Sequence, residues 1–227
     1  MLPILLLLAL TFRTFGAGLE SVGCIPSSTL DFLGETAGSY GSAAAYDRQA
    51  GILYLTTDRG PGDGQIDYAP RLYALPLPHD SGSKDSSNFN FNFNFNLNLT
   101  GPGTARLYKD PDGKPFTGLI PDSDDPEPRM KDGRRCLDPE GLSLMEDGNL
   151  YVSEEYFPSV LQFKPDGTFM ARLVPPENYL PRNPTTGQVN FREAADRKEG
   201  REDNRGFEGV ARSPDGKTVY EIGRAHV

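Results

Sequence analysis

LDPEGLSLMEDGNLYVSEEY, residues 137 to 156, carries six carboxylates in and around a pattern that is typical of a short β-hairpin. Side chains in a strand alternate between its two faces, so one buried face can be formed by Leu142, Leu144, Leu150 and Val152. Asp147-Gly148 between them favours a tight turn, because such turns need the positive φ angles that Asp and Gly tolerate. The acidic residues then gather at the strand ends, where a site can form.

The same pattern recurs along the chain. Glu208-Gly209-Val210-Ala211, a later Asp215-Gly216 and Tyr220 repeat the plan of Glu140–Ser143 and Asp147-Gly148, and a looser copy spans residues 43–58. Further strand-like segments follow at 71–75 and 160–163. Recurrent hairpins without helices between them predict an all-β fold, a partial β-propeller with about three blades of a parent that has six or seven.

Composition agrees with this fold class. The chain has 227 residues, 37 % of them hydrophobic, with 25 Gly and 20 Pro, which suits one domain of short strands and many turns. Residues 1–18 resemble a secretory signal peptide, with an apolar run from Leu2 to Leu10 followed by small residues, which predicts a secreted, extracellular protein. Removing them takes away Arg13 and leaves a net charge of −10, which argues against nucleic acid or an anionic membrane as a partner.

The remaining domain is expected to span residues 19–221. Cys24 and Cys136 would pair in an oxidising compartment, or else be two buried thiols. Asn98-Leu99-Thr100 is a glycosylation sequon. It lies in an Asn/Phe-rich stretch at 85–103, which we interpret as a low-complexity insertion in a loop. IGRAHV at 222–227 matches the translation of a common sequencing adapter, so we expect an artefact there and a truncated product.

Several motifs together resemble one family. Asp138-Pro139-Glu140-Gly141, Tyr151–Tyr156, Asn204–Gly209 and Ser213–Gly216, in this order, are similar to the phytase-like family whose domain is called "esterase-like activity of phytase". Thr57–Gly60 followed by Arg71-Leu72-Tyr73 resembles its N-terminal part. The resemblance implies a secreted or periplasmic β-propeller with a poorly defined hydrolase activity, and it assigns no catalytic residue.

The acidic residues themselves point to a chemistry. In a propeller, equivalent acids from different blades converge on the central channel, and two carboxylates about 5 Å apart repel by roughly 3 kcal/mol at an effective dielectric constant of about 20. Such groups share a proton or a cation, and oxygen ligands suit Ca²⁺. The expected metal ligands are Asp58, Asp138, Glu140, Glu155 and Glu208.

A bound Ca²⁺ would orient a phosphate or polarise an ester carbonyl, with a carboxylate activating water. The expected catalytic residues are Glu140, Glu155 and Glu208, and the expected substrate-binding residues are Arg59, Asn204 and Arg205. For the two arginines a structural salt bridge to the same carboxylates is the alternative. For Asp138 and Glu154 the alternative is a structural role as turn residues that bond to their own backbone or pair with a nearby Arg.

Two functions therefore stay open from the sequence. The first is a hydrolase of small phosphate or carboxylic esters, and the second is a secreted propeller that binds a ligand or a protein without catalysis. A Ser-His-Asp triad is disfavoured, since the only histidines are His79 in a Pro-rich loop and His226 near the end. No motif calls for an organic cofactor.

Overall fold

The computed structural model describes residues 25–26, 28–36, 40–77, 103–121, 130–190, 200–201, 205–223 and 225–226. These residues form an all-β structure with one short 3₁₀ helix, η1 (Glu177–Tyr179). The strands are β1 (Tyr40–Asp47), β2 (Ile52–Thr57), β3 (Arg71–Pro76), β4 (Thr104–Leu107), β5 (Met130–Lys131), β6 (Arg134–Arg135), β7 (Pro139–Leu144), β8 (Leu150–Glu154), β9 (Ser159–Phe163), β10 (Phe169–Leu173), β11 (Gly200–Arg201), β12 (Phe207–Arg212), β13 (Val219–Gly223) and β14 (Ala225–His226).

Most strands belong to antiparallel meanders. One four-stranded sheet has the order β1-β2-β3-β4, and a second has the order β10-β9-β8-β7. The hairpin β12-β13 forms a two-stranded sheet of its own, and β5-β6 and β11-β14 are shorter pairs. The all-β prediction is confirmed, and the described strands do not close into a barrel.

Each predicted hairpin copy is present. Leu142 pairs with Val152 and Leu144 with Leu150, so the opening stretch has the register that its alternation predicts. Gly148 has φ 82° and Gly216 has φ 70°, as the Asp-Gly turns require. The sequence motifs did not single out β4 and β10, which complete the two four-stranded sheets.

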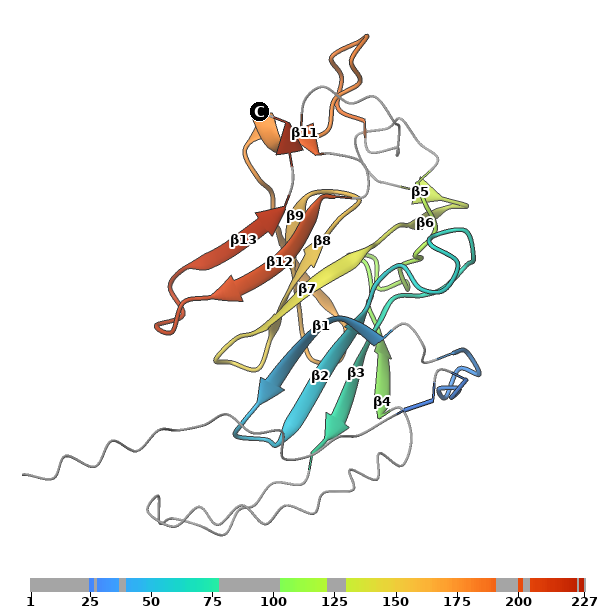
Figure 1. The fold of residues 1–227 in the computed structure, drawn as a ribbon, viewed down its shortest axis with the longest axis vertical. Coiled ribbons are helices and arrows are strands. Elements are labelled where there is room, and N and C mark those ends of the chain that lie inside the picture. The colour runs from blue at the N-terminus through green and yellow to red at the C-terminus, as the bar shows by residue number, and fades with distance from the viewer. Residues whose placement is uncertain are drawn as a thin grey trace, which may run out of the picture.

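The first strands of the three copies are neighbours. β7 contacts β1 on one side and β12 on the other (Figure 1). Two four-stranded meanders and a hairpin, adjoining through their first strands, have the arrangement expected of propeller blades. The number of blades in a longer parent stays a prediction.

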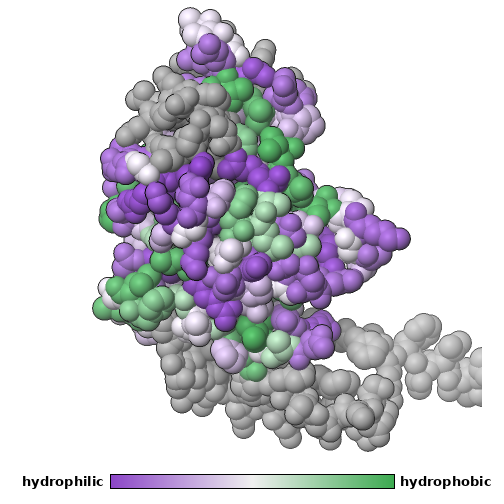
Figure 2. Space-filling model, turned by 180° about the vertical axis from the view of Figure 1, so that it is seen from behind, coloured by the Kyte–Doolittle hydropathy of each residue, from purple (hydrophilic) through white to green (hydrophobic). Residues whose placement is uncertain are grey.

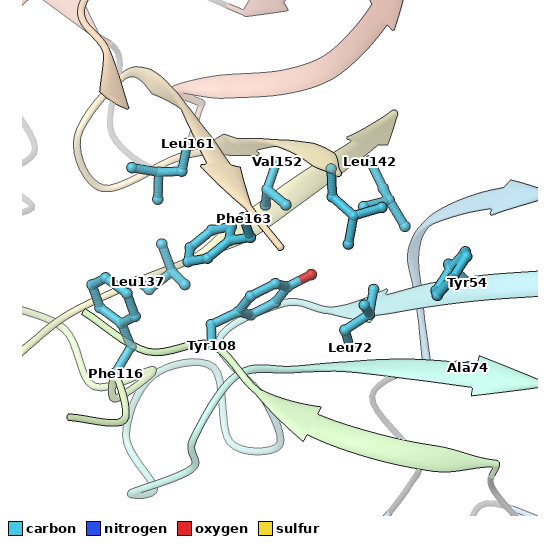
Figure 3. Packing of buried hydrophobic residues seen from close by; sticks show 11 residues of the cluster. Tyr54, Leu72, Ala74, Tyr108, Phe116, Leu137, Leu142, Val152, Leu161 and Phe163 are labelled. Carbon is cyan, nitrogen blue, oxygen red and sulfur yellow. The ribbon is translucent and has the colours of Figure 1, made fainter. Parts of the chain in front are cut away.

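The main hydrophobic core lies between the two large sheets. Tyr54, Leu72 and Ala74 come from the first sheet, and Leu142, Leu150, Val152, Leu161 and Phe163 come from the second (Figure 3). Tyr108 and Phe116 belong to the loop after β4 and pack against Phe163, with ring centroids 4.6 and 6.3 Å from it. The Tyr108 hydroxyl lies 3.0 Å from Thr56 Oγ1, so its polar end is satisfied inside the core.

A buried ion cluster ties the N-terminal turn at 30–36 to the first sheet. Arg71 at the start of β3 is completely buried and forms ion pairs with Asp31 and Glu35, and its guanidinium lies 4.1 Å from the centre of the Tyr68 ring. Tyr73 also donates a hydrogen bond to Asp31, at 3.0 Å. Cys136 is buried. Cys24 lies outside the described residues, so their pairing stays a prediction.

Other sequence predictions fall outside the described residues too. These are the signal peptide at 1–18, the glycosylation site Asn98 and all of the low-complexity stretch 85–103 except residue 103. Residues 222–223 end β13, and residues 225–226 form β14, so the adapter interpretation of 222–227 remains a prediction. The face of the molecule in Figure 2 is largely hydrophilic, with smaller hydrophobic groups between, in keeping with the acidic composition.

Candidate functional site

Three predicted acids meet where the second sheet begins. Asp138 directly precedes β7, Glu140 is the second residue of β7, and Glu155 follows β8. Each offers one carboxylate oxygen, and these three oxygens lie within 4.8 Å of one another. Because β7 and β8 are antiparallel, the start of one strand and the end of the other necessarily share an edge of the sheet.

Asp138 is the most buried of the three. Its Oδ1 accepts a hydrogen bond from the Arg59 backbone N–H at 2.9 Å, and its Oδ2 lies 3.4 Å from Arg59 Nε. Oδ2 has no hydrogen-bond donor, although it is buried. Burial and the nearby charge of Glu140 raise the pKa of Asp138 well above its usual range, against the opposing effect of Arg59.

Glu154 builds the bend that places its neighbours. Its Oε1 accepts hydrogen bonds from the backbone N–H groups of Asp138 and Tyr156, each at 3.2 Å, and its Oε2 accepts one from Phe157 at 2.7 Å. The Glu155 N–H in turn donates to the Asp138 carbonyl at 3.0 Å. Glu154 is therefore structural, and Glu155 is turned to the other side of the chain, toward the acid cluster.

Glu208 lies on β12, a strand of a different sheet that adjoins the cluster. The Ser153 hydroxyl donates to the Glu208 carbonyl at 3.1 Å, and the Gly206 N–H donates to Glu155 Oε1 at 3.2 Å. Gly141 allows this approach, since a Cβ there would lie 2.7 Å from the Val210 nitrogen and 2.9 Å from the Glu208 oxygen. Glutamates 140 and 208, far apart in the sequence, are thus brought to adjoining strands.

The pKa of Glu140 is raised by its surroundings. Burial, followed by the charges of Glu155, Glu208 and Asp58, raises the pKa of Glu140 to about 8. Its side chain remains partly exposed, whereas Asp138 and Glu155 are buried. Glu140 is therefore the member of this group that solvent can reach.

The remaining predicted site residues range from buried to exposed. Asp58 follows β2, is half-buried and has a raised pKa because of burial. Arg59 is buried, forms an ion pair with Asp63 at 2.6 Å and lies 5.7 Å from the Tyr156 ring centre. Its structural salt bridge to Asp138 is present, and direct contact with substrate stays a prediction. Arg205 is exposed, and Asn204 lies outside the described residues.

Sequence reasoning missed Glu221 on β13. Both of its carboxylate oxygens are buried and have no hydrogen-bond donor. Burial, with a contribution from Glu208, raises the pKa of Glu221 to about 9. An isolated Glu in an otherwise apolar strand carries no signal for this, because only the pairing of β13 with β12 brings it near Glu208.

Comparison with protein families shows which family the chain belongs to. Residues 37–223 match the phytase-like family, described as esterase-like activity of phytase. The chain belongs to this family. The match covers both large sheets and the β12-β13 hairpin, and hence every acid of the site. The resemblance seen in the sequence motifs is thereby confirmed.

A curated relative of this phytase-like chain comes from the fungus Arthroderma benhamiae. It is an uncharacterized secreted protein, 32 % identical in an alignment 251 positions long that covers 90 % of this chain. The aligned part is 48 % of the relative, so the chain spans about half of that protein's length.

A solved structure also matches. It is that of a putative 6-phosphogluconolactonase from Bacteroides uniformis, 13 % identical, covering 80 % of this chain and 50 % of the other at a TM-score of 0.29. No helix among the described residues is long and apolar enough to cross a membrane.

Proposed function

We propose that this phytase-like chain is part of a secreted hydrolase of phosphate or carboxylic esters, with its reaction centre at Asp138, Glu140 and Glu155. The observation that carries the proposal is the convergence of these three carboxylates where the β7-β10 sheet adjoins β12, the strand that carries Glu208. Membership of a family described by an esterase-like activity and the secreted relative support the same reading.

A Ca²⁺ ion fits the donor set. Two oxygens that each lie about 2.4 Å from one ion are separated by at most about 4.8 Å, and the three carboxylate oxygens all lie within 4.8 Å of one another. Asp138 Oδ2 is buried and accepts no hydrogen bond, and Arg59 Nε lies 3.4 Å from it, so a bound cation would share this oxygen with Arg59. Asp138, Glu140 and Glu155 would hold the ion, with Glu208 and Asp58 close by. When bound, Ca²⁺ would polarise the phosphoryl or carbonyl oxygen of the ester.

The acids differ in burial, and we assign them different roles on that basis. Glu140 is exposed enough to exchange a proton with water or with a leaving group, and a pKa of about 8 lies near the pH where acid–base catalysis is efficient. Asp138 is occupied with Arg59, and Glu155 with the Gly206 N–H. Arg205, exposed beside Gly206, would attract an anionic substrate.

The test is hydrolysis of an aryl phosphate and of an aryl acetate by the full chain, with Ca²⁺ and with a chelator. Glu140→Gln keeps the size of the side chain and removes its acid–base function, so we expect a loss in kcat of about 10²- to 10⁴-fold with little change in stability. Glu177→Gln is the matched control, because Glu177 is exposed on η1. Equal turnover by wild type and Glu140→Gln, or none by either with Ca²⁺ present, would refute the proposal.

A further inference from the structure

Strand β13 is an edge strand in the part of the chain that the structure describes. β2 lies between β1 and β3, and β8 lies between β7 and β9, whereas β13 pairs with β12 alone among the described strands. Figure 1 shows β13 at the margin of the molecule, with β12 between it and β7. Within the described ranges, the position that β3 and β9 fill in the other two sheets is open beside β13, and an open edge can accept a further strand.

The hydrogen bonds of the hairpin show which backbone groups face this open edge. The Ser213 N–H donates to the Thr218 carbonyl at 2.9 Å, so Thr218 directs its carbonyl toward β12. Because the backbone groups of an antiparallel strand alternate between its two edges, those of Val219 and Glu221 point away from β12. A strand added at the open edge would therefore bond to Val219 and Glu221.

Apolar side chains lie along the same edge. Tyr220 and Ile222 of β13 are 60 % and 70 % exposed. Strand edges that combine unpaired backbone groups with exposed apolar side chains tend to associate with other strands. Pairing at β13 would cover part of this surface.

Glu221 has a charge that its own chain leaves without a hydrogen-bond donor. Both of its carboxylate oxygens are buried, and no described group donates to them. Buried oxygens of this kind are costly unless a donor reaches them. Lys217, which is exposed at the turn end of the hairpin, lies four residues before Glu221 and thus roughly 13 Å away along one strand. A second β13, running antiparallel, would bring its Lys217 opposite Glu221.

We propose that two copies of this chain pair through their β13 strands in antiparallel orientation, with Val219 opposite its counterpart and Lys217 of each copy opposite Glu221 of the other. The joined sheet has the order β12-β13-β13-β12, and it has four strands like the other two sheets. Two-fold symmetry forms each ion pair twice. Val219 is the first residue of β13, so the axis passes near the turn end of the hairpin and the two chains extend from it in opposite directions.

Charge selects this register over its neighbours. Registers with the two-fold axis at Tyr220 or at Glu221 also satisfy the backbone alternation. The first places Val219 opposite Glu221, which gives the carboxylate no donor. The second places Glu221 opposite its counterpart, where like charges repel. The axis at Val219 is the one of the three that sets an opposite charge against each Glu221.

Sedimentation equilibrium of the full chain over a range of concentrations tests the contact. Wild type should approach twice the mass of one chain. Lys217→Glu replaces attraction by repulsion at two symmetric places, so the dimer Kd should rise by about 10-fold or more. Lys164→Glu, the same change at an exposed lysine in the turn after β9, is the matched control and should leave the Kd unchanged.

A wild type that stays monomeric at about 1 mM would overturn the proposal, because a specific contact weaker than that does not persist in solution. A segment of the same chain outside the described residues would then be the candidate for the open edge. Equal weakening by Lys217→Glu and Lys164→Glu would also overturn it, since net charge and not the pairing of β13 would be responsible.

Exchanging the two charges separates contact between copies from an effect on folding. In the double variant Lys217→Glu, Glu221→Lys, each copy again meets an opposite charge, so dimerisation lost in Lys217→Glu should return. A folded double variant that is as weakly associated as Lys217→Glu contradicts the proposed register.

Disulfide formation reports the register without any change of charge. Residues directly opposite in an antiparallel pair have Cα atoms about 4.5–5.5 Å apart, which a disulfide can span. Val219→Cys should therefore give a covalent dimer on mild oxidation. Ile222→Cys, three residues from the axis and so roughly 20 Å from its counterpart, should not. Both variants retain Cys24 and Cys136, so equal crosslinking of the two would refute the pairing at Val219.

Discussion

Glu154 and Glu155 are adjacent in the sequence and serve different purposes. Glu154 is fully buried and accepts three backbone N–H groups, while Glu155 joins Asp138 and Glu140 in the acid cluster. Glu154 is the last residue of β8 and Glu155 opens the turn that follows, so the bend turns one side chain into the fold and the other toward the site. The residue type alone does not distinguish them.

Arg71 shows the same dependence on surroundings. A completely buried guanidinium is tolerable only because Asp31 and Glu35 pair with it and the Tyr68 ring lies over it. Burial of Asp31 opposes its ionisation, but the hydrogen bond and charge of Arg71, with hydrogen bonds from the Leu33 N–H and the Tyr73 hydroxyl, outweigh this and lower the pKa of Asp31 below its ordinary value.

The Asp31–Arg71 pair predicts a pH effect on stability. An acid with a lowered pKa in the folded state stabilises fully above its unfolded-state pKa of about 3.8 and loses this contribution as the pH falls through the lowered value. Comparing urea unfolding of wild type and Asp31→Asn isolates it, since other acids titrate in both proteins. The stability advantage of wild type should be constant above about pH 5 and shrink below pH 4. An advantage that grows on acidification would contradict the assignment.

At the scale of elements, the close approach of β7 and β12 depends on a missing side chain. A Cβ at Gly141 would lie 2.4 Å from Ser153 Oγ and 2.7 Å from the Val210 nitrogen, both closer than van der Waals contact. The nitrogen belongs to the backbone of β12, so it cannot move without moving the strand. Glycine is thus required here for space between strands.

We expect Gly141→Ala to push the hairpin away from the second sheet. It should lower the free energy of unfolding by about 1–3 kcal/mol, as overpacking does, and speed exchange at 205–212. Gly209→Ala is the matched control on the same hairpin, because its Cβ would meet only Ile222 Cγ2 at 3.0 Å, the end of an exposed side chain. A Gly141→Ala protein as stable as Gly209→Ala would show that the two strands do not approach so closely.

At the scale of the whole molecule, one core connects the two large sheets. Phe163 is completely buried on β9 and packs against Tyr108 and Phe116, which follow the first sheet in sequence. Side chains from both sheets fill the space between them (Figure 3). Neither sheet can therefore keep its apolar face covered if the other unfolds.

This shared core predicts cooperative unfolding of the two sheets. Phe163→Ala should cost about 3–5 kcal/mol and shift far-UV circular dichroism and near-UV tyrosine signals to the same lower denaturant midpoint. The chain has no Trp, so tyrosine is the available reporter. Phe32→Ala, at a position 69 % exposed, is the control and should change stability by less than about 0.5 kcal/mol. Two separate transitions in wild type would rule out a common core.

The sequence by itself determined the local structure and the identity of the acids. Alternating apolar residues around Asp-Gly turns specify hairpins β7-β8 and β12-β13, because strand period and turn geometry are properties of a few consecutive residues. It also named Asp138, Glu140, Glu155 and Glu208, since repeated acids at strand ends are visible in the chain.

Only the tertiary structure decided what each acid does. Burial and distance between segments separate Glu154 from Glu155, pair Arg59 with Asp138 and bring Glu221 next to Glu208. These relations join residues up to about 80 positions apart, as Arg59 and Asp138 are. The physical reason is that ionisation and hydrogen bonding respond to the three-dimensional surroundings of a group, which no local pattern of residues contains.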